Sequence, residues 1–183
     1  MNEPTNILRD EHVLILRALD LLETAAARAT GGGHVDDDWW ARLVAWLRGF
    51  ADRNHHHKEE RLLFPAMERA GVPAAGGPIG VMLEEHAEGR ALIVAMETTV
   101  GADRVTNVRR YVRLLRAHID KENDVLFPIA DSVIDDTTRL ALTRDFSAMA
   151  DELGRDASLA WAEAEITGIA AALNVPAEGA SRS

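Results

Sequence analysis

The sequence predicts an all-α fold, an antiparallel up-down-up-down four-helix bundle with an additional C-terminal helical segment. Apolar residues recur at helical spacing throughout the chain, and no segment reads as a strand. Short segments rich in glycine, proline or aspartate separate four long helical stretches. Because short connections join antiparallel neighbours, the four stretches are expected to form a bundle.

The first two helices are bounded by residues that cap or end helices. Asn6 can cap a first helix that runs to about Ala29, and the glycines at 31–33 end it. Aspartates at 36–38 supply a cap and a negative first turn for a second helix, which ends near Gly71. Each helix carries an apolar stripe, so both are expected to face the core.

The third and fourth helices follow a loop at 72–78 that is rich in proline and glycine. The third helix runs to about Val100, and residues 101–103 make a tight connection to the fourth. Both helices have apolar residues along one face, which completes the bundle.

A further helical region follows the bundle. Asp135, Asp136 and Thr137 supply its cap, Gly154 interrupts it, and a second piece ends at about Leu173. We expect this region to pack outside the bundle as a cover. The predicted parts are a bundle at 1–134, a C-terminal helical cover at 135–175 and a flexible tail at 176–183.

The composition narrows the class of protein. The 183 residues are 47% hydrophobic, enough for a buried core, and the lack of cysteine excludes disulfides and thiolate metal sites. A net charge of −10 argues against nucleic acid as a partner. No signal peptide is visible and no run of about 18 apolar residues occurs, so we expect no membrane partner and a cytoplasmic location.

One segment occurs twice in the chain. Residues 55–65 and 118–128 align on a shared Leu-Phe-Pro, and each begins with a histidine followed four residues later by a glutamate. Residues four apart lie on one face of a helix, so each copy aims an imidazole and a carboxylate at the same point. The alignment pairs His55 with His118, Lys58 with Lys121 and Glu59 with Glu122.

Two more histidines lie at a matching depth. His12 and His86 are about two turns inside the first and third helices. With a rise of about 1.5 Å per residue, antiparallel packing brings them level with the duplicated pairs. Four imidazoles and two carboxylates suit two first-row transition ions with the carboxylates bridging them. The predicted metal ligands are His12, His55, Glu59, His86, His118 and Glu122.

Neighbouring residues compete for these roles on the second helix. On a helical wheel, His55 and Glu59 lie on the apolar stripe, whereas His56 and Glu60 lie roughly a quarter-turn away and His57 points to the far side. We therefore take His55 and Glu59 as ligands, with His56 as the alternate. The remaining charge from His56 to Glu60 is expected to face away from the metals.

A metal-free core is the main alternative interpretation of these residues. A single histidine on an apolar face is usually a hydrogen-bonded core residue. Glu11 and Glu85, just before His12 and His86, are interpreted as acids favoured by the helix dipole rather than as partners of imidazoles. A buried glutamate without a cation is costly, however, and two of them share the inward stripe with four histidines. The pattern therefore favours a metal site.

These residues resemble the hemerythrin-like family with the HHE cation-binding domain. The resemblance rests on the order His, His-x-x-x-Glu, His, His-x-x-x-Glu, with Leu-Phe-Pro after each pair, and covers about residues 6–131. It implies an antiparallel four-helix bundle that holds two Fe ions in an oxo- or hydroxo-bridged di-iron centre. It also implies that the four histidines are terminal ligands and that Glu59 and Glu122 bridge the irons.

The chain departs from the oxygen-carrying hemerythrins, which use a fifth histidine from a His-x-x-x-His pair on the third helix. Met82 and Arg90 occupy the positions four residues from His86, so that pair is absent, and Glu122 stands where the carriers have aspartate. The resemblance is therefore to a four-His, two-Glu branch linked to iron or oxygen sensing, nitric oxide or peroxide responses and di-iron repair. Reversible oxygen carriage is not expected.

Two functions and one structural alternative follow. The first is a di-iron protein that binds or senses dioxygen, peroxide or nitric oxide, with at most a weak peroxide-decomposing activity and no dedicated catalytic residue. The second is an interaction or regulatory module that responds to iron or zinc without catalysis. Zinc or manganese are substitutes for iron, and a homodimer is left open. The third is a metal-free helical scaffold.

Overall fold

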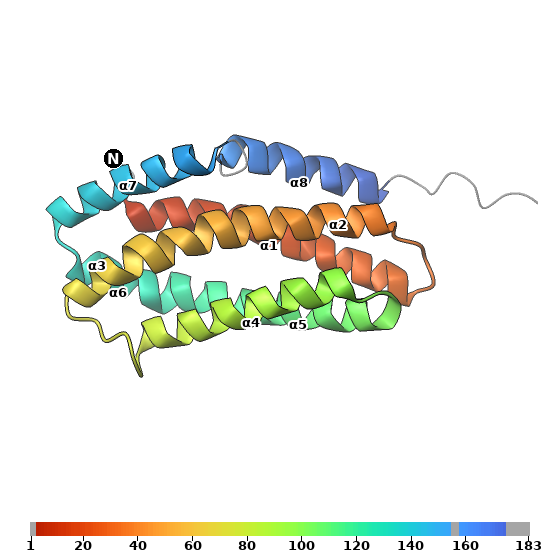
Figure 1. Cartoon of the computed structure of the whole chain (residues 1–183), viewed down its shortest axis with the longest axis horizontal. Helices are drawn as coiled ribbons and strands as arrows, with labels where there is room; N and C mark the ends of the chain where they lie inside the picture. Colours follow the sequence, from red (N-terminus) through yellow and green to blue (C-terminus); the bar gives the residue numbers. More distant parts are fainter. Residues whose placement is uncertain (1–2, 155–157, 175–183) are drawn as a thin grey trace, which may run out of the picture.

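The structure, a computed structural model, describes residues 3–154 and 158–174. In these ranges the chain is helical between short connections and contains no strand (Figure 1). The predicted all-α fold is confirmed.

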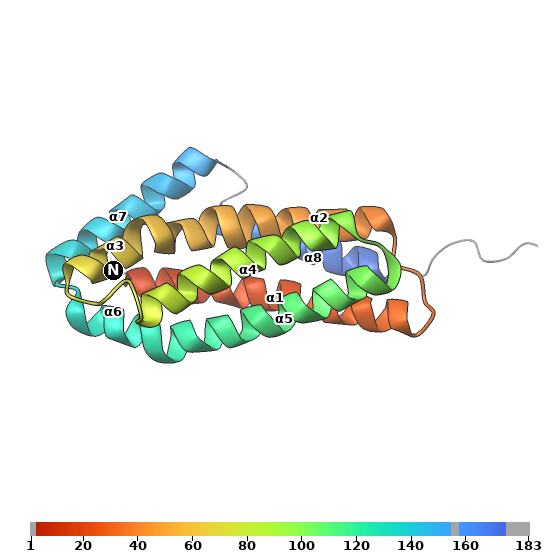
Figure 2. The same cartoon turned by 60° about the horizontal axis from the view of Figure 1, so that its bottom comes forward.

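Four long rods form the bundle, and two of them contain π-helical segments, which are labelled η. The first rod is α1 (Pro4–Thr30), and the third is α4 (Pro78–Thr98). The second rod joins α2 (Asp37–Trp46), η1 (Leu47–His56), η2 (Glu59–Leu63) and α3 (Phe64–Arg69). The fourth rod joins α5 (Gly101–Lys121), η3 (Glu122–Leu126) and α6 (Phe127–Val133). Figures 1 and 2 show the rods side by side and alternating in direction, as predicted.

The start of α1 differs from the prediction. The helix begins at Pro4, so Asn6 is not its cap but lies in the first turn, where its side-chain oxygen accepts a hydrogen bond from Arg9 at 3.2 Å. The physical reason is Pro4, whose fixed φ suits the first helical position and whose missing N–H is not needed there. The helix ends at Thr30, before the glycine run, as expected.

Two further helices follow the bundle. Asp135 caps α7 (Asp136–Leu153) by accepting a hydrogen bond from the backbone N–H of Thr138 at 2.9 Å. Gly154, with a φ of +78° that favours glycine, ends that helix, and α8 (Leu159–Asn174) follows. Both helices run along the outside of the bundle, where α8 packs on α1 and α2 and α7 packs on α1 and the π segments of the second rod (Figure 1).

Two tryptophans anchor α8 to the second rod. The indole N–H of Trp39 donates to the carbonyl of Ile169 at 2.8 Å, and that of Trp46 donates to Ala162 at 3.1 Å. Both indole rings are buried, so α8 covers apolar surface that α2 would otherwise expose. The division at residue 134 stays an interpretation, and the predicted tail at 176–183 lies outside the described residues.

The bundle core has a polar layer between two apolar clusters. The larger cluster lies towards α2 and α8, and the smaller one lies towards α3, α6 and α7. The larger includes Ile15, Ala51, Ile93 and Leu115, and the smaller includes Leu8, Phe64, Met82, Phe127 and Phe146. Among the helices of residues 3–154 and 158–174, none combines the length and apolar character needed to cross a membrane.

Candidate metal centre

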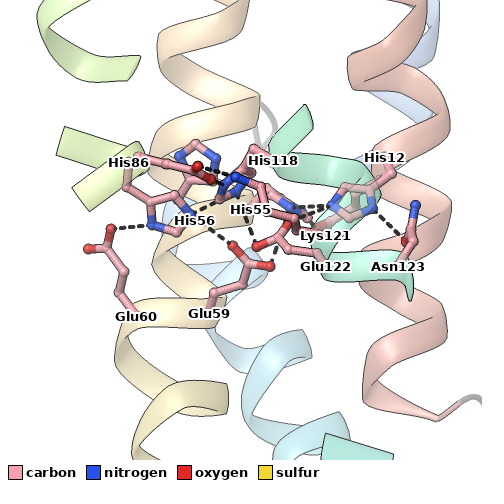
Figure 3. A network of polar contacts seen from close by, with 12 residues as sticks. His12, His55, His56, Glu59, Glu60, His86, His118, Lys121, Glu122 and Asn123 are labelled. Atoms are coloured by element: carbon pink, nitrogen blue, oxygen red, sulfur yellow. Dashed lines mark hydrogen bonds and ion pairs between the residues drawn. The ribbon is translucent and has the colours of Figure 1, made fainter. Parts of the chain in front are cut away.

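The polar layer contains all six predicted metal ligands. His12 comes from α1, His86 from α4 and the two His-Glu pairs from the second and fourth rods, and all of them point to one place in the bundle (Figure 3). Each of the six residues is at most 1% exposed. The six residues that the sequence spacing predicted to converge therefore lie together in the structure. Metal binding by these residues stays a prediction.

The four histidines form two pairs joined at their Nε2 atoms. The Nε2 atoms of His12 and His55 are 3.0 Å apart, and those of His86 and His118 are 3.1 Å apart. Each pair joins neighbouring rods, so two imidazole nitrogens converge in each half of the centre.

The two glutamates span these pairs. The two oxygens of Glu59 lie 3.6 Å from His55 Nε2 and 3.4 Å from His86 Nε2. The two oxygens of Glu122 each lie 3.1 Å from an Nε2, one from His12 and the other from His118. Each carboxylate thus faces two imidazoles, one from each pair, which is the arrangement that a bridging ligand requires.

The outward-facing ring nitrogen of each predicted histidine ligand has a polar partner. An Nδ1–H that donates outward leaves the lone pair of Nε2 facing the centre, and metal-binding histidines are commonly oriented in this way. The Nδ1 contacts are His12 with Asn123 at 3.0 Å, His55 with Glu11 at 3.0 Å, His86 with Glu60 at 2.7 Å and His118 with Glu85 at 2.9 Å.

The interpretation of Glu11 and Glu85 as helix-dipole acids was therefore wrong. Each carboxylate accepts from a histidine and also pairs with a lysine of the duplicated motif, Lys58 for Glu11 and Lys121 for Glu85. Burial raises the pKa of Glu11, but the hydrogen bond with His55 and the charge of Lys58 outweigh it and hold that pKa below its ordinary value. The hydrogen bond with His118 and the contact with Lys121 likewise hold the pKa of Glu85 below its ordinary value, so histidine and lysine together keep each acid ionised. Tertiary pairing across helices decided this role.

The expectation that the charge from His56 to Glu60 faces away from the centre was also wrong. His56 is only 4% exposed and its ring stacks on that of His86, with centroids 3.9 Å apart. Lys58 is buried as well, and Glu60 contacts His86. The error comes from the wheel, because η1 and η2 are π-helical and have more residues per turn than the α-helix it assumed.

The Leu-Phe-Pro sequence explains the π turn at each glutamate. The backbone N–H of Phe64 donates to the carbonyl of Glu59, and that of Phe127 donates to the carbonyl of Glu122, five residues back in both copies. The following residue in each copy is a proline, which has no N–H to continue an α-helical ladder. The repeated proline therefore favours a wider turn at each glutamate.

Buried charge indicates that a cation belongs here. Among the described residues, both oxygens of Glu59 and one of Glu122 are buried without a hydrogen-bond partner. Burial alone would lower the pKa of His118, but the charge of Glu122 and the hydrogen bond with Glu85 raise it to about 10. Burial opposes ionisation of Glu122 too, yet His118 and His12 hold its pKa well below the ordinary value. Partly unpaired carboxylates at this depth are costly unless a cation compensates them.

The donor set fits two metal ions. Imidazole nitrogens and carboxylate oxygens suit iron, zinc and other first-row ions. Among the described residues there are two groups of possible ligand atoms, and Glu59 belongs to both. Within each group, all the ligand atoms lie within 4.8 Å of one another. One group is His12, His55, Glu59 and Glu122, and the other is His56, Glu59, His86 and His118.

Comparison with known proteins identifies a cation-binding family. A family model described as the hemerythrin HHE cation binding domain matches residues 3–130, which include all six predicted ligands and exclude α7 and α8. Proteins named iron-sulfur cluster repair protein YtfE, from Yersinia pestis (strain Pestoides F) and Yersinia pseudotuberculosis serotype O:1b (strain IP 31758), are 38% identical over 88 residues, covering 42% of this chain and 40% of each relative. The chain therefore spans about two fifths of the length of these relatives. No solved structure matches.

Proposed function

The chain belongs to the hemerythrin HHE cation-binding domain family, and from this premise we propose that it holds two iron ions and binds or senses dioxygen, peroxide or nitric oxide. The observation that carries the proposal is the placement of the two glutamates. Glu59 faces His55 and His86, and Glu122 faces His12 and His118, so each carboxylate lies between the two histidine pairs.

The residues have separate roles in this proposal. His12 and His55 would hold one ion, His86 and His118 would hold the other, and the two glutamates would lie between them. Two iron ions held in this way would supply a centre that binds a small diatomic or peroxide ligand and exchanges electrons with it. Zinc or manganese could occupy the same donors.

The surrounding residues fix the rings and exclude water. The acidic partners of His55, His86 and His118 hold each Nδ1 and keep each Nε2 directed inward. The Phe64 ring stacks on His86 at 6.0 Å and the Phe127 ring stacks on His12 at 5.5 Å between centroids, which covers the centre on its α3 and α6 side.

A small ligand has room to approach from one side. A cavity of about 270 Å³ opens between α1 and the C-terminal helices, with Asp10, Glu11, Lys58 and Phe146 among its lining residues. Glu11 hydrogen-bonds His55, so the cavity ends one side chain away from the predicted ligands. Peroxide and diatomic molecules are far smaller than this space.

Sensing or a damage response is favoured over oxygen carriage. Arg90 does not turn into the centre but pairs with Asp52 and Glu60, and Met82 lies in the smaller apolar cluster. The printed name of the relatives describes repair of iron-sulfur clusters, and we propose for this chain a role in the response to the reactive molecules that damage iron centres. Weak decomposition of peroxide is the furthest catalytic activity proposed, because the acids behind the predicted ligands, Glu11, Glu60 and Glu85, are each paired with a lysine or arginine.

A regulatory module without catalysis is the second candidate. It is favoured by the position of α7, which packs against η1 and η2, the segments that carry His55 and Glu59. A change in metal occupancy would then alter the packing of α7, which lies at the outer surface of the bundle. In this case metal loading would protect α7 from proteolysis.

The test is iron content and visible absorption of the natively expressed full chain. The proposal predicts two irons per chain and a ferric absorption band that changes on addition of peroxide or nitric oxide. The double variant His55→Ala with His118→Ala should lose both the iron and the band. A wild-type chain that contains no iron and takes up none would contradict the proposal.

A further inference from the structure

We propose that His56 is a fifth imidazole ligand of the centre, bound to the metal held by His86 and His118. The inference rests on the proposed two-metal site, and it gives the two metals different numbers of imidazole ligands. It places three imidazoles on one metal and two on the other.

The first support is the position of the His56 ring. A ring nitrogen of His56 belongs to the group of ligand atoms within 4.8 Å of one another that also includes Glu59, His86 and His118. The residue is 96% buried, and its ring stacks on His86 and meets His118 edge-on with centroids 5.7 Å apart. Its Nδ1 is buried without a hydrogen-bond partner among the described residues. Because Nδ1 faces Asp52, 3.5 Å away, the nitrogen available to the metal is Nε2.

The second support is the chain of groups behind the ring. Arg90 donates to Asp52 at 2.7 Å and to Glu60 at 2.7 Å. Glu60 accepts from His86, and Asp52 lies 3.5 Å from His56 Nδ1. Asp52 therefore stands behind His56 as Glu60 stands behind His86, with one guanidinium fixing both acids. Acidic groups behind both rings are typical of metal-binding histidines.

The third support is the contrast between the two copies of the motif. Aligned on Leu-Phe-Pro, His56 corresponds to Ile119, which is also buried. The half that contains His55 and His12 therefore has no counterpart of the additional imidazole. The asymmetry extends outward, because His86 faces the carboxylate of Glu60 whereas His12 faces the amide of Asn123.

These contacts also explain how a centre without a histidine pair on α4 can still provide five imidazoles. Arg90 occupies one of the two positions, four residues from His86, at which such a pair would be completed. In this chain Arg90 holds the acids behind His56 and His86 instead. The π-helical turn of η1 brings His56 closer to the inward face beside His55 than an α-helical turn would.

The direct test counts ligated histidines in the wild-type chain loaded with Co²⁺. A histidine bound through one ring nitrogen keeps an N–H on the other, and a paramagnetic ion shifts that proton far outside the normal range of the spectrum. Proton NMR should show five such exchangeable signals. Four signals would overturn the assignment of His56 without touching the two-metal site, and a chain that binds neither Co²⁺ nor Fe²⁺ would overturn both.

A matched pair of variants gives an independent readout. In His56→Gln, titration with Co²⁺ should show one of two ions bound at least about tenfold more weakly, with the other unchanged. The neighbouring His57→Gln should bind both ions as the wild type does. Equal binding of both ions by His56→Gln and the wild type would overturn the proposal.

Discussion

The backbone N–H of Phe64 donates to the carbonyl of Glu59, five residues earlier in the chain, and Phe127 repeats this bond with Glu122. Each bond closes a π turn that ends at a Phe-Pro pair. Because a wider turn changes where side chains point, these bonds set the direction of the two glutamates and of the residues beside them. The duplicated Leu-Phe-Pro therefore affects the geometry of the centre by determining the backbone conformation at Glu59 and Glu122.

Replacing the proline of this turn should loosen the centre. Pro65→Ala restores an N–H and lets α-helical bonding compete with the π turn, which would turn Glu59 away from its place between His55 and His86. We expect weaker iron binding with no loss of thermal stability of the metal-free protein. Iron retention during dialysis against a chelator and thermal melting measure the two effects. The control is Pro78→Ala, at the start of α4 and outside the π-helical segments, and equal iron retention by Pro65→Ala and this control would refute the role of the turn.

Removing the charge of Glu11 should damage both metal binding and folding. Glu11→Gln leaves Lys58, which is 3% exposed, without its anionic partner and weakens the contact with His55. We expect a loss of about 3–5 kcal/mol in unfolding free energy and a ten- to hundredfold weaker metal affinity, on the order typical of such partners.

The matched comparison for Glu11 is Glu85, which holds the equivalent place in the other half. Its lysine, Lys121, has a side chain that is 41% exposed, so water can solvate the charge left by Glu85→Gln. The stability loss should therefore be clearly smaller than for Glu11→Gln, while metal affinity falls in both. Chemical unfolding of the two variants, side by side, decides the point, and equal losses of stability would count against it.

The metal-free protein should be most stable in mildly acidic solution. His118 has its pKa raised from 6.5 to about 10, so its stabilising effect is complete below pH 6.5 and is lost as the pH rises towards 10. Glu60 is partly buried, but contacts with His86 and Arg90 lower its pKa from 4.5 to about 2, so its effect is complete above pH 4.5 and is lost towards pH 2. Burial lowers the pKa of His56, which acts in the opposite sense to the raised values of His55, His86 and His118.

The expected stability maximum therefore lies between about pH 4.5 and 6.5, the ordinary pKa values of a glutamate and a histidine. Unfolding by denaturant across the pH range, after removal of metal, measures it. With metal bound the protein should instead gain stability as the pH rises through this range, because the ligands must lose their protons to bind. A metal-free protein that becomes steadily more stable up to pH 9 would contradict the account.

The C-terminal helices should stabilise the bundle through Phe146. This ring on α7 is 1% exposed and belongs to the smaller apolar cluster beside the centre. Phe146→Ala should cost about 3–5 kcal/mol of unfolding free energy, as expected for a buried aromatic ring. Leu140→Ala on the same helix, where the side chain is 50% exposed, should cost little. Similar unfolding free energies for the two variants would show that α7 does not pack as described.

Much of the fold could be predicted because its signals are local. Helical spacing, the cap at Asp135 and the break at Gly154 are properties of short segments, and the structure confirms the bundle and the additional helices. The contacts of Glu11, His56 and Arg90 are harder to predict, because the sequence offers imidazole orientation by Glu11 and ligation by His56 only as less favoured alternatives and indicates no contact for Arg90. Glu11 acts through contacts between helices distant in sequence, and His56 depends on a π turn that an α-helical wheel does not represent. The duplicated segment predicted which residues converge, but it did not predict which groups hydrogen-bond the Nδ1 atoms of the histidines.

The most direct measurement is a crystal structure of the iron-loaded chain with anomalous diffraction at the iron edge. The account predicts two iron peaks within the polar layer, with the carboxylates of Glu59 and Glu122 each contacting both. A single peak, or iron bound outside the layer of His12, His55, His86 and His118, would contradict it.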